Sequence, residues 1–270
     1  MKKIIALILS VIMLLSMAAC GTGANTDVSS ETESKAAATT DLDYIKEKGK
    51  LVVGITVYEP MNYEDENGEW TGFDTEFAEA VAEKLDVDVE FIVIDWNNKW
   101  ATLESKKIDV VWNGMTLSDE AKANASCTNP YVLNAQVVVM KSDKLADYTT
   151  EESLKDLSFA VEAGSACKDI AAEKEYNYKE YDAQSDAMTA IKTGKADACI
   201  IDITMAKAMT GEGTSFADLG VGISLTEEEY AIACRKGSDL TAKINGFMND
   251  MKADGSLQAL ADKYSLTLAE

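Results

Sequence analysis

Charged and aromatic side chains follow several apolar stretches of the sequence, at the points where buried strands would end. Asp202 follows the apolar run 199–201, and Tyr58 and Trp96 follow other stretches rich in Val and Ile. A partly buried carboxylate needs a cation as its partner, and two aromatic faces can enclose a ligand side chain. Ordinary core packing of the rings and an N-cap role for Asp202, before a helix near Ile203, are the alternatives.

The composition excludes several kinds of chemistry. The 270 residues include no His, and 47 Asp and Glu against 25 Lys and Arg give a formal net charge of −22. Without His there is no Ser-His-Asp or Cys-His catalysis and no His-ligated metal. A charge of −22 does not attract nucleic acid or a bare anionic membrane. These kinds of site and a nucleic-acid partner are therefore excluded. For the protein as a whole we expect no catalytic residues, no metal and no cofactor.

The apolar pattern alternates between strand and helix from residue 41 onward. Strands are predicted at 51–55, 87–96, 109–112, 137–140, 159–161, 198–201 and 231–234. Helices are predicted after Gly72 (with Phe77, Val81 and Leu85 on one face), at 100–105, 166–175 and 185–193, and from Leu240 to a stop at Gly255. Strands that alternate with helices indicate an α/β fold.

The N-terminus has the features of an export signal. Lys2 and Lys3 precede an apolar run that is shorter than the roughly 20 residues of a membrane-spanning helix. Small residues before Cys20 resemble a lipobox, although Met17 fits less well than Leu. This resemblance implies a signal peptide at 1–19 and lipid on Cys20. Residues 20–40 are small and polar, which predicts a flexible tether.

Seven short motifs follow one another in a fixed order. They are Gly54–Tyr63, Gly68–Asp74, Asn113–Glu120, Asn129–Tyr131, Glu162–Ser165, Gly194–Ala198 with Asp202, and Lys252–Ser256. The ordered set resembles the family 3 extracellular solute-binding proteins, the polar amino-acid receptors of ABC importers. Pro60 and Pro130, the only prolines, stand at positions typical of that family.

The resemblance implies a two-lobed α/β fold, periplasmic-binding-protein-like and of type II. Lobe 1 would comprise 41–130 plus 231–270 and lobe 2 would comprise 136–225, with crossing strands at 131–135 and 226–230 as the hinge. An amino acid or related small amine would bind between the lobes, which close on it. The resemblance also implies an exported monomer on the outer face of the cytoplasmic membrane. Its partners would be an ABC permease with its ATPase, and the membrane only through the lipid on Cys20.

The resemblance further implies the ligand-binding residues. They are Tyr58, Trp96, Asn113, Gly114, Thr116, Ser165, Ala166 and Asp202, with Ile55 and Glu162 as possible additions. The Gly114 carbonyl, the Thr116 hydroxyl and Asp202 would bind the ligand ammonium. Ser165 and the Ala166 amide would present a helix N-terminus to its carboxylate. A plain turn after residue 113, with Ser118 as an N-cap, is the alternative for that segment.

One position departs from the family. The family places an Arg that clamps the ligand carboxylate where this chain has Ala121, and the single Arg, Arg235, lies in another segment. Lys122 could replace that Arg as a point charge, the helix N-termini near Ser118 and Ser165 could suffice, or the ligand could lack the carboxylate. We favour the backbone amides. Ile55, at a position that is often polar in relatives, favours an apolar or modest ligand side chain.

Two cysteines would meet if the crossing strands align Tyr131 with Tyr230. In that register Cys127 faces Cys234, which predicts a disulfide that an exported protein can keep. Buried free thiols are the alternative. The cysteine spacing contains no CxxC pair and is unlike that of a zinc site.

Two other functional classes compete with a non-catalytic receptor. A dehydratase-like enzyme on the same fold could use Glu162 as an acid or base, although no second catalytic group stands near it in the sequence. A ligand-sensing domain would need a second membrane segment and a cytoplasmic domain, and we expect neither. A turnover assay separates the enzyme from the receptor, and neighbouring permease and ATPase genes separate the importer from the sensor.

Overall fold

The computed structural model describes residues 40–270. The predicted signal peptide, Cys20 and residues 21–39 of the predicted tether lie outside the described residues. Within residues 40–270, none of the helices is both long enough and apolar enough to cross a bilayer.

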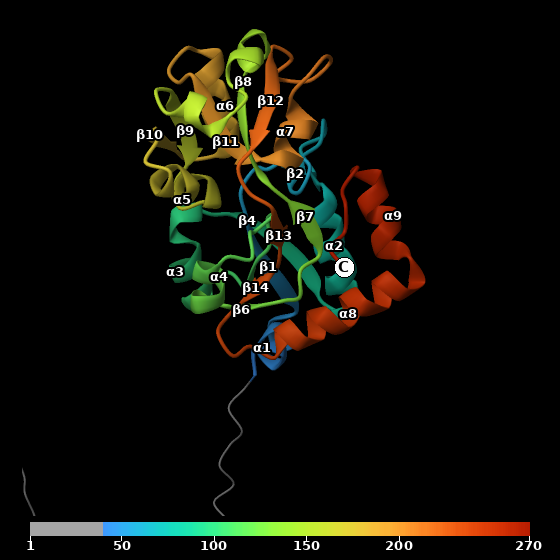
Figure 1. Cartoon of the computed structure of the whole chain (residues 1–270). Helices are drawn as coiled ribbons and strands as arrows, with labels where there is room; N and C mark the ends of the chain where they lie inside the picture. Colours follow the sequence, from blue (N-terminus) through green and yellow to red (C-terminus); the bar gives the residue numbers. More distant parts are fainter. Residues whose placement is uncertain (1–39) are drawn as a thin grey trace, which may run out of the picture. The chain divides into compact units, whose positions relative to one another are not determined.

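Lobe 1 is built on a five-stranded sheet of order β4-β1-β5-β14-β6 (Figure 1). Its strands are β1 (Lys50–Ile55), β4 (Asp88–Val93), β5 (Val110–Val111), β6 (Ser126–Cys127) and β14 (Ala233–Cys234). Strands β4, β1 and β5 are parallel, and β14 is antiparallel to both of its neighbours. The remaining elements are α1 (Asp41–Lys48), β2 (Tyr63–Glu64), β3 (Trp70–Thr71), α2 (Phe73–Leu85), η1 (Trp96–Asn98), α3 (Lys99–Glu104), α4 (Asp119–Asn124), α8 (Leu240–Asp254) and α9 (Ser256–Lys263).

Lobe 2 is built on a second five-stranded sheet of order β10-β9-β11-β8-β12. Its strands are β8 (Gln136–Lys141), β9 (Ser158–Glu162), β10 (Asn177–Tyr181), β11 (Ala198–Asp202) and β12 (Leu219–Ser224). β10, β9 and β11 are parallel, whereas β8 is antiparallel to both β11 and β12. The helices are η2 (Ser142–Asp147), η3 (Glu151–Leu154), α5 (Ala166–Glu173), α6 (Gln184–Lys192) and α7 (Ile203–Met209).

Two short strands connect the sheets. β7 (Val132–Asn134) and β13 (Glu228–Tyr230) pair antiparallel, with Glu228 opposite Asn134. Figure 1 shows this pair between the two larger sheets. Both strands fall inside the segments that were expected to cross between the lobes. The prediction of a two-lobed α/β fold with two crossing strands is confirmed.

The local sequence pattern explains why the elements of lobe 1 pack together. Phe77, Val81 and Leu85 recur every four residues and are all buried on the inner face of α2. The Phe77 ring meets the ring of Trp112 edge to face, with centroids 4.9 Å apart. Each such side chain contributes about 1.5–3 kcal/mol by burial, so the sheet that carries the pocket residues has a firm support.

The predicted disulfide is wrong. The register of β14 against β6 places Cys127 opposite Ala233 and Cys234 opposite Ser126. Successive strand residues point to opposite faces of a sheet, so this one-residue offset turns Cys234 to the face away from Cys127. All four cysteines of residues 40–270 are free thiols.

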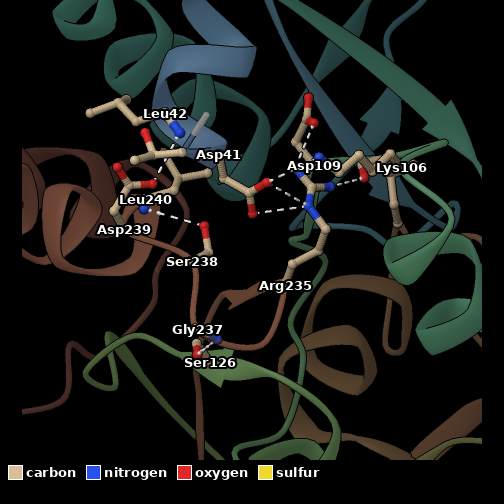
Figure 2. Close-up of polar contacts among 12 residues, drawn as sticks. Asp41, Leu42, Lys106, Asp109, Ser126, Arg235, Gly237, Ser238, Asp239 and Leu240 are labelled. Carbon is tan, nitrogen blue, oxygen red and sulfur yellow. Dashed lines mark hydrogen bonds and ion pairs between the residues drawn. The ribbon is translucent and has the colours of Figure 1, made fainter. Parts of the chain in front are cut away.

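The single arginine has a structural role in lobe 1, shown in Figure 2. Arg235 Nε donates to both carboxylate oxygens of Asp41, at 3.0 and 2.9 Å. Its other nitrogens donate to the Ile108 carbonyl at 2.7 Å and to Asp109 Oδ1 at 3.1 Å. Arg235 therefore joins α1 to the segments before β5 and after β14, and it does not line the pocket described below.

Candidate ligand-binding site

A cavity of about 260 Å³ lies between the two sheets and is lined from both lobes and from the segment that includes β13. This volume is slightly below the usual range for drug-sized ligands, so it suits a molecule of amino-acid size. The pocket brings together all eight predicted ligand-binding residues and the possible contact Glu162, namely Tyr58, Trp96, Asn113, Gly114, Thr116, Glu162, Ser165, Ala166 and Asp202. Their contact with a ligand stays a prediction.

Two of the possible contacts lie elsewhere. Ile55 is fully buried within β1 and packs in the core of lobe 1, so its side chain does not reach the pocket. Lys122 lies on α4 with its side chain 55% exposed and its Nζ 3.9 Å from Asp119. Ala121, one residue earlier on that helix, lines the pocket. A step of one residue turns the helix by about 100°, which points Lys122 away from the pocket.

Asp202 does not act as a helix cap. It precedes α7, but its side chain makes no capping hydrogen bond. Instead, Oδ1 accepts from Asn134 Nδ2 at 2.5 Å and from Gln136 Nε2 at 2.7 Å, and Oδ2 accepts from Gln184 Nε2. All three donors are neutral amides, and no ion pair links Asp202 to any Lys or Arg of residues 40–270.

A second carboxylate shares the same donors. Glu228 Oε1 accepts from Asn134 Nδ2 at 2.5 Å and from Gln136 Nε2 at 2.6 Å, and also from Thr116 Oγ1 at 3.0 Å. Burial and the neighbouring charge of Asp202 raise the pKa of Glu228 to about 7. Burial also raises the pKa of Asp202. We call Asp202 and Glu228 the acid pair, because together they form a buried negative site that a cation would stabilise.

The aromatic wall of the pocket depends on a glycine. Gly114 has φ +53°, and a Cβ at this position would lie 2.6 Å from the Tyr58 ring. The Tyr58 hydroxyl lies 2.5 Å from both the Thr204 and the Tyr230 hydroxyls. Tyr58 of lobe 1 therefore contacts Thr204 of lobe 2 at one edge of the pocket. Only glycine at position 114 leaves room for the Tyr58 ring.

The turn that carries Gly114 is held from inside lobe 1. Asn113 uses its amide within the lobe, accepting from Thr56 N–H and Oγ1 at 3.0 and 2.7 Å. Asp74, buried in α2, accepts from Gly114 N–H at 2.6 Å and from Tyr131 Oη at 2.9 Å. Asn113 therefore positions the neighbouring backbone of the pocket, since its own side chain is already engaged.

The lobe 2 wall begins at α5. Ser165 caps this helix by accepting from Lys168 N–H at 3.4 Å and donates to the Glu162 carbonyl at 2.7 Å. Gly164, with φ +68°, is in close contact with the backbone of lobe 1. A Cβ at this position would lie 2.6 Å from the Asn97 Cα. The predicted helix N-terminus is present, and close contact between the lobes brings it to the pocket.

Burial of acids predicts a pH dependence of the unliganded protein. Burial is the main cause that raises the pKa of Asp74 to about 7 and, with the charge of Asp202, the pKa of Glu162 to about 8. Such groups add stability below their unfolded pKa values, near 4, and this stability is lost as pH rises through their folded values. We expect the free energy of unfolding to fall between pH 5 and pH 8.5, on the order of 3 kcal/mol per group.

Urea unfolding at a series of pH values measures this loss. Glu162→Gln removes one titrating group and should flatten the decline between pH 7 and 8.5, whereas Glu180→Gln, at an exposed position of β10, should leave it unchanged. A Glu162→Gln profile with the wild-type slope would contradict the assignment.

Several pocket residues escaped the sequence reasoning. They are Lys99, Trp100, Gln136, Gln184 and Glu228, among other lining residues. One signal for Gln136 was available, since it stands two residues after Asn134 and side chains two apart share a face in an extended segment. Glu228 stands two residues before Tyr230, so these two side chains also share a face of their strand. For Lys99 and Gln184 the local sequence offers no comparable signal.

Two lobes joined by two strands, with a pocket lined from both, define a two-lobed small-molecule-binding protein. The chain belongs to the bacterial extracellular solute-binding proteins, family 3, whose model matches residues 51–267. The resemblance seen in the ordered motifs is thereby confirmed.

Individual relatives agree with this membership. The chain is 30% identical over 227 residues to the L-cystine-binding protein TcyJ of Escherichia coli (strain K12), covering 83% of this chain and 85% of the relative. Among solved structures, the P235GK mutant of ArgBP from T. maritima matches with a TM-score of 0.78 and 31% identity, covering 83% of this chain and 98% of the other. The ancestral amino acid-binding protein AncCDT-1, a precursor of cyclohexadienyl dehydratase, matches with a TM-score of 0.76 and 30% identity, with 83% and 98% covered.

Proposed function

We propose that this protein is the extracytoplasmic substrate-binding component of an ABC importer and captures an amino acid or a related small amine. The observation that carries the proposal is the acid pair. Asp202 and Glu228 share two amide donors at the inner wall of a pocket between two lobes. Two buried carboxylates without a cationic partner are unfavourable, and a ligand ammonium would supply that partner.

Closure of the lobes on the ligand is part of the proposal. The connecting strands β7 and β13 would act as the hinge, within the proposed segments 131–135 and 226–230. Lobe 1 would comprise 41–130 with 231–270, and lobe 2 would comprise 136–225. Contacts on two sides of the pocket support this division, because Tyr58 meets Thr204 and Asn97 meets Gly164 across the lobes.

The cellular setting follows from the N-terminal sequence and the family. We propose export, cleavage after residue 19 and lipid on Cys20, which would anchor a monomer to the outer face of the cytoplasmic membrane. The bound ligand would pass to a permease driven by an ATPase. A mass spectrum of the membrane-extracted protein tests the first step, because a mature chain that begins at an unmodified residue would contradict lipidation.

The acidic pocket favours ligands that carry positive charge. Six carboxylates line it against the single cation Lys99: Glu120, Glu162, Asp169, Asp202, Glu227 and Glu228. The relative TcyJ is an L-cystine-binding protein, and ArgBP from T. maritima has been solved with arginine bound. We therefore expect L-amino acids to bind, with cationic ones ahead of acidic ones, because glutamate would bring another negative charge to the pocket.

A thermal-shift screen tests the proposed function. L-Arginine, L-lysine, L-histidine, L-glutamine, L-cystine and L-glutamate, each at 2 mM, are compared with buffer. A ligand present at a hundredfold excess over its Kd adds about 2.7 kcal/mol to the free energy of unfolding, which is a clear rise in Tm. Absence of a shift with all six compounds, followed by absence of binding in calorimetry, would contradict an amino-acid receptor.

An enzyme remains the second candidate, on one observation. The structure brings Glu162, whose pKa is raised to about 8 by burial, into the same pocket as Asp202. A protonated acid beside a second carboxylate is an arrangement that acid–base catalysis uses. Chromatography of a bound amino acid after prolonged incubation separates the two functions, since a receptor returns its ligand unchanged.

A further inference from the structure

Lys99 is the single cation among the residues that line the pocket. It begins α3 and is 4% exposed. Its Nζ donates to the Gly164 carbonyl at 2.7 Å and to the Trp96 carbonyl at 3.3 Å. It makes no ion pair with any carboxylate of residues 40–270. The buried ammonium therefore has only neutral partners.

No carboxylate pairs with this ammonium, although the charges of Glu120, Glu162, Asp169 and Asp95 act on it without direct contact. Burial lowers the pKa of Lys99, because desolvation disfavours the charged form. An ammonium has three N–H donors, and the two backbone carbonyls use two of them. One donor therefore stays available to a group in the pocket.

The surroundings of Lys99 leave room for an anionic group. The Nζ lies 5.1 Å from the centroids of both the Trp96 and the Trp100 rings, which hold the side chain at the pocket wall. Ala121, which is small, lines the same cavity. The first turn of α5, from Ala166, lies beside the contact between Lys99 and Gly164 and adds the positive end of a helix dipole. The acid pair approaches the cavity from β11 and β13 instead.

We propose that Lys99 binds the carboxylate of the ligand and so takes the place of the arginine that is missing at Ala121. This inference rests on the proposed function, because it assigns the second charge of an amino-acid ligand. The acid pair would bind the ammonium and Lys99 the carboxylate. The pocket would then bind zwitterions more tightly than simple amines. Backbone N–H groups at the start of α5 would also donate hydrogen bonds to the ligand carboxylate.

A purely structural role gives a different expectation. The bond from Lys99 to the Gly164 carbonyl crosses between the lobes, so Lys99 could instead serve only to hold them together. Loss of such a contact weakens every ligand by the same factor. Loss of a carboxylate partner weakens only those ligands that carry a carboxylate.

Calorimetry with matched probes separates these two roles. L-Arginine, L-histidine and L-glutamine are each compared with the corresponding carboxyl amide, which keeps the ammonium and lacks the anion. In the wild type we expect the free acid to bind about tenfold to a hundredfold more tightly than its amide. Lys99→Met keeps the length of the side chain and should bring the ratio close to one, mainly by weakening the acid.

Two further variants complete the design. Lys99→Arg keeps the charge and should retain most of the preference for the free acid. Lys168→Met removes a lysine of α5 that does not line the pocket and should leave the preference unchanged. A Lys99→Met protein that keeps the wild-type ratio, or that loses affinity equally for acid and amide, would overturn the proposal while the amino-acid receptor stands. If the wild type binds none of the six probes, both proposals fall.

Discussion

Replacing Asp202 by Asn should weaken amino-acid binding by a few hundredfold or more. Asp202 accepts hydrogen bonds from the side-chain amides of Asn134, Gln136 and Gln184. Such donors stabilise a carboxylate, so Asp202 is the member of the acid pair that we expect to carry the charge. Asn keeps the size of the side chain and removes that charge. A buried ligand ammonium that loses its counter-charge costs about 3–5 kcal/mol.

Calorimetry with the tightest compound of the thermal-shift screen measures the effect. Asp218→Asn removes an exposed carboxylate of the same lobe and serves as the matched control, with an expected change of less than twofold. Glu228→Gln should have a smaller effect than Asp202→Asn, because burial and the charge of Asp202 raise the pKa of Glu228 to about 7, so that it carries only part of a negative charge at neutral pH. If Asp202→Asn binds like Asp218→Asn, the acid pair is not the ammonium site.

The second large effect concerns closure of the lobes. Gly164→Ala should raise the Kd by roughly tenfold to a hundredfold, because the new Cβ would lie 2.6 Å from the Asn97 Cα of the opposite lobe. The backbone cannot yield as a flexible side chain does, so the closed state would bear an overpacking cost of about 1–3 kcal/mol. An open state would lack this contact, so the apparent affinity would fall with the fraction of molecules that can close.

A glycine in the same lobe provides the control for this change. Gly194 has φ +71°, and a Cβ at this position would have no neighbouring atom within 4 Å. Gly194→Ala therefore repeats the strain of a positive φ without any contact between the lobes. We expect both variants to lose similar stability and only Gly164→Ala to lose affinity and to remain extended with ligand in small-angle scattering. Equal affinities would show that contact at Gly164 is not needed for closure.

Much of the fold could be predicted because the relevant signals are local. The burial of Leu51–Ile55 and the four-residue repeat of Phe77, Val81 and Leu85 gave β1 and α2 directly. The predicted stop at Gly255 is the C-cap of α8. Less apolar elements such as β10 and β12 were missed, because their burial alternates weakly and depends on what packs against them.

The site was predictable only in part. Strand ends supplied Tyr58, Trp96 and Asp202, since a buried strand that is followed by an aromatic or charged residue leaves a signal in the sequence. The family resemblance supplied Gly114. Strand registers were not predictable to one residue. The crossing strands pair Tyr230 with Val132, and in the lobe 1 sheet β14 pairs Ala233 with Cys127, which separates Cys127 from Cys234. Closeness in sequence suggested Lys122 as one substitute for the missing arginine, although helix geometry turns it outward, whereas nothing in the local sequence indicated Lys99.

By itself the sequence determined the α/β alternation, the family and the end of the pocket that carries Asp202, because hydrophobic periodicity and ordered motifs are written along the chain. Only the tertiary structure decided which charged and polar groups surround Asp202. Asn134 reaches Asp202 across 68 positions and Glu228 across 94, and Lys99 meets the Gly164 carbonyl across 65. Electrostatic interactions depend on distance and burial in space, so the acid pair and its opposing cation exist only once the crossing strands bring the two lobes together.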